Sequence, residues 1–168
     1  MARVFVGVGS NVDRQRHIRA GVQALQTLFT NVQVSTIYQN AAVGFAGEDF
    51  YNLVVAFTTD EDVTATYYLL RGIEDAHGRD RKQPRFSPRT LDLDLLLYDD
   101  LVMHNDLFQI PRDDIDKYAF VLKPLAELAV DIAHPVSGKT FAALWEAFNQ
   151  SGQELKPVQS DWLTAPGE

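Results

Sequence analysis

Asp92 and Asp94 are the two residues of this chain whose types and spacing are best suited to chemistry. In the segment 91–98 they alternate with leucines, which predicts that both lie on one face of a β-strand. Side chains two residues apart on a strand are separated by about 6 to 7 Å. Carboxylates at that separation can reach two metal ions about 3.5 to 4 Å apart, as in sites that assist phosphoryl transfer. Mg²⁺ is the expected metal, because it prefers oxygen ligands and often takes only one or two carboxylates.

The stretch that precedes the aspartates is rich in cations. Six of the 15 Lys and Arg residues lie between residues 71 and 89, in a chain whose formal net charge is -8. Arginine makes bidentate contacts with phosphate oxygens, so the cluster predicts a cradle for a nucleotide–magnesium complex. Two alternatives stay open: the aspartates form the solvated face of a half-buried strand, and the cations lie on a helix end and a basic loop. The six cations are Arg71, Arg79, Arg81, Lys82, Arg85 and Arg89.

Other common site types lack their residues. The chain has no cysteine, which rules out a disulfide framework and fits a cytoplasmic location, and its 4 histidines lack zinc-ligand spacing. The run Gly7-Val8-Gly9-Ser10-Asn11-Val12 lacks the third glycine of a dinucleotide fingerprint, and no G-x-x-x-x-G-K-[ST] phosphate loop occurs. We interpret Gly9-Ser10-Asn11 as a tight strand-to-helix turn capped by Asn11.

Length and composition predict one domain of ordinary size. A chain of 168 residues can bury a sufficient core without staples. We place this domain at residues 1–150 and a peripheral tail at 151–168, from which Trp162 and Leu163 could dock on the body. We find neither a signal peptide nor an apolar run of membrane-spanning length, so no membrane partner is expected. The negative net charge argues against nucleic-acid binding.

Hydrophobic periodicity predicts strands at 3–8, 32–39, 49–59 and 91–98, and helices at 13–29 and 62–78. The order β-α-β-β-α-β predicts an α+β fold. This element order is typical of a ferredoxin-like α/β sandwich, with a mainly antiparallel sheet and helices on one face.

Four weaker patterns extend this prediction. Gly78 is a plausible stop for the second helix. The pair Asp99-Asp100 predicts a hairpin into a strand at 101–104. A helix is expected at 122–129 with Pro124 in its first turn, and another at 140–148 with Thr140 as its cap.

Four motifs taken together resemble one known family. They are Gly9-Ser10-Asn11, Asp49-Phe50-Tyr51-Asn52, Ile73-Glu74 with Gly78-Arg79, and Pro88-Arg89-Thr90-Leu91-Asp92-Leu93-Asp94. They are similar to motifs of the 6-hydroxymethyl-7,8-dihydropterin pyrophosphokinases of folate biosynthesis, over roughly residues 2–149. The resemblance implies transfer of the β,γ-pyrophosphoryl group of ATP to the hydroxymethyl oxygen of the dihydropterin, which gives AMP and the pterin diphosphate. It implies ATP as co-substrate, two Mg²⁺ ions and small-molecule partners only, and we expect a monomer.

The resemblance also assigns residues to the phosphate end of the site. Asp92 and Asp94 would hold the two magnesium ions, and with Arg79 and Arg89 they form the expected catalytic set. Arg81 matches a basic position on a mobile loop, and Glu74 matches an acidic residue beside the ATP site. The expected nucleotide-binding residues are Glu74, Arg79, Arg81, Arg89, Ile110 and Arg112.

The pterin end would be built from aromatic and amide side chains. Phe50 and Phe120 match the pair that sandwiches the flat ring, and Asn52 matches the side chain that reads its edge. Val43 and Gly44 match the segment whose backbone closes the pocket. Stacking supplies affinity, while an amide offers both a donor and an acceptor to the mixed edge of a pterin. For either phenylalanine, ordinary core packing is the alternative.

Three positions depart from the family pattern. The stretch 40–44 lacks the usual proline, Arg112 stands where a histidine is usual, and Phe86-Ser87 replaces a common Trp-Gly. An arginine can contact phosphate but cannot act as a neutral imidazole. Two other functions remain as hypotheses, the first motivated by these departures and the second by the aspartates and arginines taken alone. One is a pterin- or nucleotide-binding module of the same fold without turnover, and the other is a different two-metal phosphohydrolase.

Overall fold

Strand β1 (Ala2–Ser10) lies inside an antiparallel sheet whose strand order is β5-β1-β4-β3-β8, with β2 also paired to β4. The computed structural model describes residues 1–42, 47–78 and 90–163. The remaining strands of the sheet are β2 (Thr30–Val34), β3 (Ile37–Asn40), β4 (Phe50–Thr59), β5 (Asp92–Tyr98) and β8 (Lys156–Val158). The helices are α1 (Arg14–Leu28), α2 (Val63–Ala76), α3 (Asp114–Lys117), α4 (Ala119–Leu128), α5 (Phe141–Ala147) and the 3-10 helix η1 (Asp161–Leu163).

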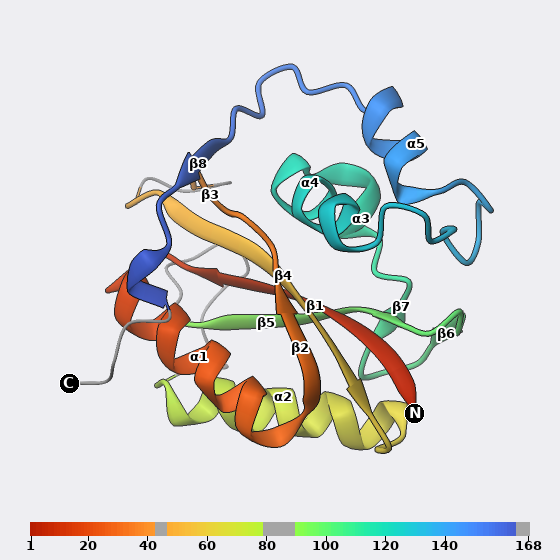
Figure 1. Cartoon of the computed structure of the whole chain (residues 1–168), viewed down its shortest axis with the longest axis horizontal. Helices are drawn as coiled ribbons and strands as arrows, with labels where there is room; N and C mark the ends of the chain where they lie inside the picture. Colours follow the sequence, from red (N-terminus) through yellow and green to blue (C-terminus); the bar gives the residue numbers. More distant parts are fainter. Residues whose placement is uncertain (43–46, 79–89, 164–168) are drawn as a thin grey trace.

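Helices cover both faces of this sheet (Figure 1). On one face, here called the α1 face, α1 and α2 bury apolar residues such as Ile18 and Leu70 against the inward side chains of the strands. On the other, here called the α4 face, Leu122 and Leu125 of α4 pack with Phe141 of α5. The predicted ferredoxin-like α/β fold is confirmed. The prediction that helices lie on one face only is wrong, because the segment after β5 also forms apolar helices.

The strand predicted at 32–39 is in fact two strands, β2 and β3, which pair with different parts of β4. Ser35 separates them. Its backbone N–H donates to the Val54 carbonyl at 3.0 Å, and its hydroxyl accepts from the Val54 N–H at 2.9 Å. A side chain thus replaces a backbone group in the ladder, which interrupts the strand without releasing it from the sheet.

The turn predicted at Gly9-Ser10-Asn11 is also wrong. Strand β1 continues to Ser10, and the N-cap position of α1 is Asp13. The Asn11 amide instead donates to the Glu48 carbonyl at 3.1 Å. The chain turns after the glycines, so both glycines belong to the strand.

The second helix matches its prediction more closely. Asp62 caps α2 by accepting from the Ala65 N–H at 2.7 Å, and the helix gives way to Gly78 at φ +76°. A left-handed backbone of this kind suits glycine, because it has no Cβ.

Two predictions in the C-terminal half need correction. The strand after Asp99-Asp100 pairs not with β5 but with the next segment, so that β6 (Met103–His104) and β7 (Gln109–Ile110) form their own hairpin. The Asn105 side chain organises this hairpin by accepting the N–H groups of residues 107 and 108. Helix α4 begins at Ala119, so Pro124 lies inside it and not in its first turn. The cap predicted for α5 is confirmed, since Thr140 accepts from the Ala143 N–H at 3.1 Å.

The chain after residue 150 extends the sheet. Strand β8 pairs antiparallel with β3, and Figure 1 shows this segment running from α5 to the β3 edge of the sheet. Trp162 stacks on Tyr51 with ring centroids 6.2 Å apart, and Leu163 is 8% exposed within the core of the α1 face. The docking expected of Trp162 and Leu163 therefore occurs, and the sheet continues past the boundary predicted at 150.

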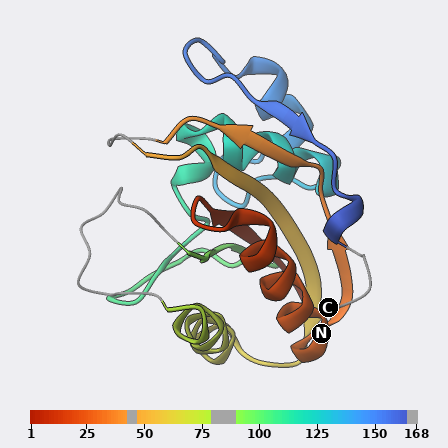
Figure 2. The same ribbon diagram turned by 90° about the vertical axis from the view of Figure 1, so that its left-hand side faces the viewer.

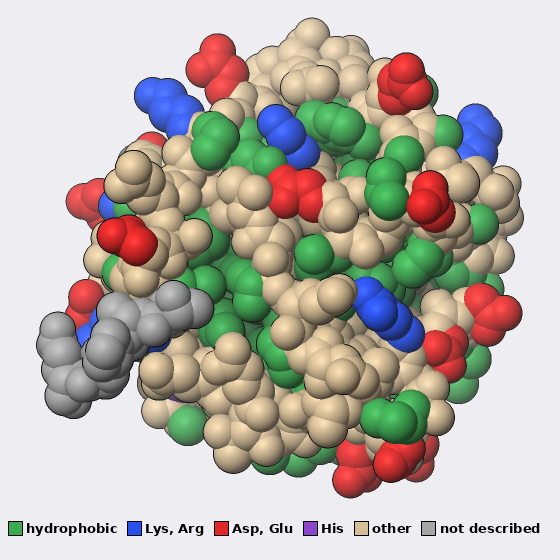
Figure 3. Space-filling view, viewed as in Figure 1, with side chains coloured by type: hydrophobic (Ala, Val, Ile, Leu, Met, Phe, Trp, Pro, Cys, Tyr) green, Lys and Arg blue, Asp and Glu red, His purple; other side chains and the backbone are tan. Residues whose placement is uncertain are grey.

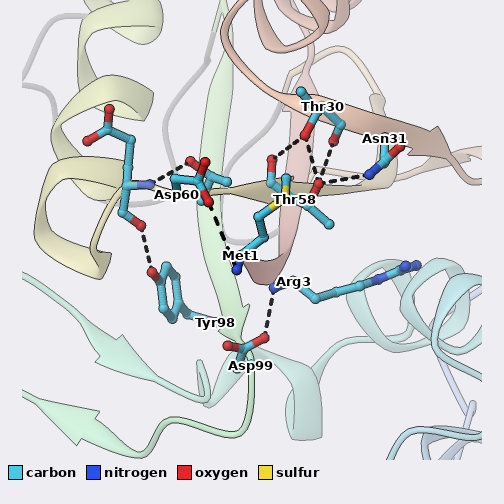
Figure 4. A network of polar contacts seen from close by, with 10 residues as sticks. Met1, Arg3, Thr30, Asn31, Thr58, Asp60, Tyr98 and Asp99 are labelled. Carbon is cyan, nitrogen blue, oxygen red and sulfur yellow. Dashed lines mark hydrogen bonds and ion pairs between the residues drawn. The ribbon is translucent and has the colours of Figure 1, made fainter.

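Polar contacts fasten the end of the sheet where the chain begins (Figure 4). The Arg3 N–H donates to Asp99 Oδ1 at 2.7 Å, and the Tyr98 hydroxyl donates to the Glu61 carbonyl at 2.6 Å. The first bond ties β1 to the turn after β5, and the second ties β5 to the residues just before α2. The opposite end of the same strands is left to carry other groups.

The surface agrees with the charge balance of the sequence. On the face shown in Figure 3, Lys and Arg side chains stand apart from one another among acidic and apolar groups. That face offers no continuous basic surface. Within the described ranges, no helix is both long and apolar enough to cross a membrane.

Candidate functional site

The predicted metal-binding aspartates and Asn52 lie on one face of the two strands that flank β1. Gly9 of β1 is paired with Asp92 of β5 on one side and with Asn52 of β4 on the other. Gly7 is likewise paired with Asp94. Because side chains alternate along a strand, all of these residues point to the α4 face, where the next alternate residues of β4 and β5 join the core under α4. The sheet thus brings the acidic pair and the amide into one row.

The two glycines leave the floor of this row open. A Cβ at Gly9 would lie 2.6 Å from Asn52 Oδ1, closer than real Cβ contacts allow. A Cβ at Gly7 would meet Leu96 at 3.6 Å, which is an ordinary contact. Gly9 is therefore required for the position of the Asn52 amide. A usable signal was present, a second glycine at strand spacing after Gly7, but we interpreted Gly9 as part of a turn.

Arg112 places a positive charge beside the aspartate pair. Its guanidinium lies 3.7 Å from Asp94 Oδ1 and donates from Nε to Asp114 Oδ2 at 2.9 Å. Its backbone N–H donates to the Leu96 carbonyl at 3.0 Å, which ties the residue to β5. The structure therefore places Arg112 beside Asp94, at the end of the site where the sequence predicted nucleotide binding.

The pair of carboxylates is electrostatically unbalanced. Burial, and after it the charge of Asp92, raises the pKa of Asp94 from its ordinary 3.8 to about 7, although Arg112 acts in the opposite direction. The neighbouring Asp94 in turn raises the pKa of Arg112, so the guanidinium stays charged. A site with this excess of negative charge favours an additional cation.

Glu74 and Arg71 support the strand from its edge. Glu74 is fully buried and accepts from the Leu93 N–H at 2.7 Å, while the Arg71 guanidinium donates to the Leu93 carbonyl. The two side chains also form an ion pair at 3.0 Å. In the described sheet β5 is an edge strand, so these contacts replace a missing neighbour strand. The structure brings Glu74 to β5 but holds its carboxylate inside the protein, away from solvent.

The aromatic and amide residues lie at the other end of the row. The Asn52 amide is 8% exposed and donates to Asn40 Oδ1 at 2.6 Å, which fixes its orientation. Phe50 precedes it on the same face of β4, and Phe120 projects from the first turn of α4. The ring of Phe120 stacks on Tyr118 with centroids 5.0 Å apart. A cleft of about 640 Å³ opens here, with Asn40, Tyr118 and Phe120 among its lining residues.

The remaining predicted residues have two outcomes. Ile110 is 1% exposed with its side chain in the core of the α1 face, so only its backbone is available to a ligand. Val43, Gly44, Arg79, Arg81 and Arg89 lie outside the described residues.

Sequence reasoning missed Asn40 and Tyr118. A polar residue at an inward strand position was the available signal for Asn40. Nothing local indicated that Tyr118 would stack on Phe120.

A family model and individual relatives match most of this chain. Residues 5–130 match the family model described as 7,8-dihydro-6-hydroxymethylpterin-pyrophosphokinase. A Pseudomonas aeruginosa protein named 2-amino-4-hydroxy-6-hydroxymethyldihydropteridine pyrophosphokinase is 35% identical over 159 residues, which cover 92% of this chain and 97% of that protein. An Aquifex aeolicus protein of the same name is 31% identical over 141 residues, with 83% and 88% covered.

Solved structures show the same fold at low identity. An HPPK-DHPS protein crystallised in complex with substrates superposes with a TM-score of 0.68 at 12% identity, over 89% of this chain. The match spans only 44% of that longer chain. The wild-type Plasmodium falciparum HPPK-DHPS with SDX-DHP gives a TM-score of 0.65 at 11% identity, covering 87% of this chain and 43% of the other.

Gly9→Ala is expected to displace the Asn52 amide and break its bond to Asn40. The clash is with the end of a side chain, so we expect a loss of only about 1 to 2 kcal/mol in the free energy of unfolding. Gly72→Ala is the matched control, because its Cβ would meet nothing within 4 Å on a helix. That change should add about 0.5 to 1 kcal/mol. Urea denaturation measures both, and NMR of the Asn52 side-chain amide detects the displacement. An unmoved Asn52 signal in Gly9→Ala would contradict the geometry.

Asp94→Asn is expected to stabilise the metal-free protein above pH 7. Between pH 3.8 and about 7 the folded protein keeps a proton on Asp94 that the unfolded chain has lost. The free energy of unfolding therefore falls as the pH rises through this window. An amide has no such charge to bury, so the variant should gain about 1 to 3 kcal/mol at pH 8. The gain should vanish near pH 3.8, where the wild-type carboxyl is protonated or becoming so in both states.

The measurement is urea denaturation in EDTA at pH 8 and at pH 4. The exposed Asp106→Asn serves as the control, since it removes the same charge away from the site. Equal stability of Asp94→Asn, Asp106→Asn and wild type at pH 8 would rule out the raised pKa of Asp94.

Proposed function

The chain belongs to the 7,8-dihydro-6-hydroxymethylpterin-pyrophosphokinase family, and from this premise we propose that it transfers the β,γ-pyrophosphoryl group of ATP to 6-hydroxymethyl-7,8-dihydropterin. This reaction is a step of folate biosynthesis. One observation carries the proposal: a pair of carboxylates suited to phosphate chemistry and an oriented amide suited to a pterin share one row of the sheet, separated by Gly9 alone.

The proposed reaction forms one bond and breaks one. The hydroxymethyl oxygen of the pterin attacks the β-phosphorus of ATP, and the bond from that phosphorus to the α,β-bridging oxygen breaks. The electron pair of the broken bond stays with AMP, and the proton of the hydroxyl is released. No covalent enzyme intermediate is needed. The work of the protein is then to position two substrates and to balance charge, as in other phosphoryl transfers.

At the pterin end, Phe50 and Phe120 would stack on the two faces of the ring. Asn52 would read the ring edge, because its bond to Asn40 uses one amide hydrogen and leaves a second hydrogen and the Oδ1 acceptor. By the resemblance of its sequence, the chain would close the pocket with the backbone of Val43 and Gly44. The fixed amide supports this assignment, since a preoriented donor and acceptor lose little freedom on binding.

At the phosphate end, Asp92 and Asp94 would hold magnesium. The donor set fits: both carboxylates lie on one face, and the pKa of Asp94 is raised by burial and by Asp92, so that a cation there relieves an existing imbalance. Within the described residues no group of three metal-ligating side chains occurs, which agrees with a metal that takes its other ligands from phosphate and water. Bound Mg²⁺ would neutralise charge on the polyphosphate.

The arginines would complete this end of the site. Arg112 already lies beside Asp94 and can turn its guanidinium toward a phosphate while staying paired with Asp114. Arg79, Arg81 and Arg89 are proposed phosphate contacts from the sequence alone. Glu74 would act by holding β5, and Ile110 would contact the nucleotide through its backbone.

Asp92→Asn and Asp94→Asn are each expected to lower turnover by at least about 10²-fold, because each removes an anionic ligand needed to stabilise the transferring group. The assay mixes the protein with ATP, MgCl₂ and 6-hydroxymethyl-7,8-dihydropterin and follows AMP and pterin diphosphate by chromatography. EDTA should abolish product formation, and Asp106→Asn should behave as wild type. Substrate binding without product would identify an inactive binding module, and phosphate release without pterin would identify a hydrolase.

Phe120→Ala is expected to weaken pterin binding while leaving ATP binding unchanged. Loss of one stacking face should cost about 1 to 3 kcal/mol, or about 5- to 150-fold in Kd. Phe148→Ala is the control, since this half-buried ring stacks on Trp145 at 5.7 Å, at the end of α5. Isothermal titration with each ligand separates the two effects. Equal weakening of pterin and ATP binding in Phe120→Ala would point to a disrupted core.

A further inference from the structure

The helix that carries Phe120 does not cap itself. The N-cap position of α4 is Tyr118, in an extended conformation with φ -124° and ψ 126°, and its side chain makes no cap hydrogen bond. Phe120 lies in the first turn, where the N–H groups of Val121 and Leu122 bond to the Tyr118 carbonyl but that of Ala119 requires an acceptor from outside the helix. The group that accepts from Ala119 therefore helps to set the position of the adjacent Phe120.

A side chain from the C-terminal segment supplies the missing cap. Gln153 Oε1 accepts the N–H of Ala119 at 2.8 Å, and Gln153 Nε2 donates to the Lys117 carbonyl at 3.2 Å. The amide thus bridges the backbone on both sides of Tyr118. The same side chain has an acceptor and a donor, and both are used on the turn that leads into α4.

The segment that carries Gln153 is itself anchored to the sheet. Gln39 of β3 is paired with Lys156 of β8, only three residues after Gln153. Farther along, Trp162 stacks on Tyr51. Figure 2 shows the segment running from the top of the molecule down past the edge of the sheet. Gln153 therefore connects the start of α4 to the sheet through a strand.

The other end of α4 has separate anchors. Glu127 accepts from the Thr36 N–H at 3.0 Å and from the Tyr38 hydroxyl, both on the β2–β3 side of the sheet. The first turn, by contrast, borders the cleft of about 640 Å³ that is also lined by Gln153. Loss of the Gln153 bonds would leave the far end of the helix fixed and give the first turn room to move.

We propose that Gln153 is a positioning residue for the pterin site, which acts through Phe120. By bridging Lys117 and Ala119, it sets the place of the stacked Tyr118–Phe120 pair opposite Phe50 and Asn52. This proposal rests on the proposed role of Phe120. It also gives a function to a part of the chain that lies beyond residue 130, where the family match ends.

Gln153→Leu should raise the KM for the pterin by about 3- to 10-fold, with the KM for ATP and kcat within about twofold of wild type. These values follow from the loss of one or two hydrogen bonds that orient a stacking ring. Gln153→Glu keeps the oxygen that accepts from Ala119, and a negative charge suits a helix N-terminus. The pterin KM of Gln153→Glu should therefore lie between those of wild type and Gln153→Leu. Gln150→Leu, the same change at an exposed neighbour on this segment, should match wild type.

Steady-state kinetics of the full chain with each substrate varied, together with thermal melts, tests the proposal. A rise confined to the pterin KM, in the order Gln153→Leu, Gln153→Glu, wild type, supports it. Parallel changes in both KM values and kcat that follow the melting temperature would show a purely structural role and overturn it. If Phe120→Ala weakens pterin binding but Gln153→Leu does not, the proposal fails and the proposed function stands. If Phe120→Ala itself does not weaken pterin binding, the assignment of Phe120 is wrong and the proposal for Gln153 falls with it.

Discussion

The burial of Asp94 beside a second carboxylate, Asp92, is the constraint around which this site is built. Burial, and after it the charge of Asp92, raises the pKa of Asp94 to about 7, so the ionised pair destabilises the strand that carries it. The surroundings answer this from two directions. Arg112 supplies positive charge beside the Asp94 carboxylate. The buried Glu74, with its ion-paired arginine, holds the backbone of Leu93 at the strand edge. In the described sheet, β5 can therefore carry the pair with β1 as its one neighbouring strand.

The sheet also fixes the distance between the two ends of the site. Asp92, Gly9 and Asn52 stand on three adjacent strands, so their spacing follows from the spacing of paired strands and not from any loop. The absence of a Cβ at Gly9 is what allows Asn52 to lie over β1. Rigid elements thus hold both the phosphate end and the ring-edge end of the proposed site, which is how precise geometry is best maintained. Phe120 is the exception, because it comes from a helix start that another segment must hold.

Stability and function conflict at the acidic pair. A folded protein that raises the pKa of Asp94 loses stability as the pH rises toward neutrality. A cation or a ligand that binds only the folded state would return that stability by mass action. The main hydrophobic cores on the two faces of the sheet supply the reserve that makes this tolerable.

Local pattern determined the acidic pair, the two long helices and most of the strands, the glycine that follows α2, the cap of α5 and the family, because each depends on residues close together in the chain. Tertiary structure alone decided the rest. Ser35 divides a strand because its partner Val54 is on another one, and Gly9 belongs to a strand because both of its neighbours are distant in sequence. The buried Glu74 accepts a hydrogen bond from a backbone N–H 19 residues away. Gln153 accepts from the first N–H of a helix that begins 34 residues before it. Periodicity records which face of an element is apolar, but it does not record which distant group will satisfy a given hydrogen bond.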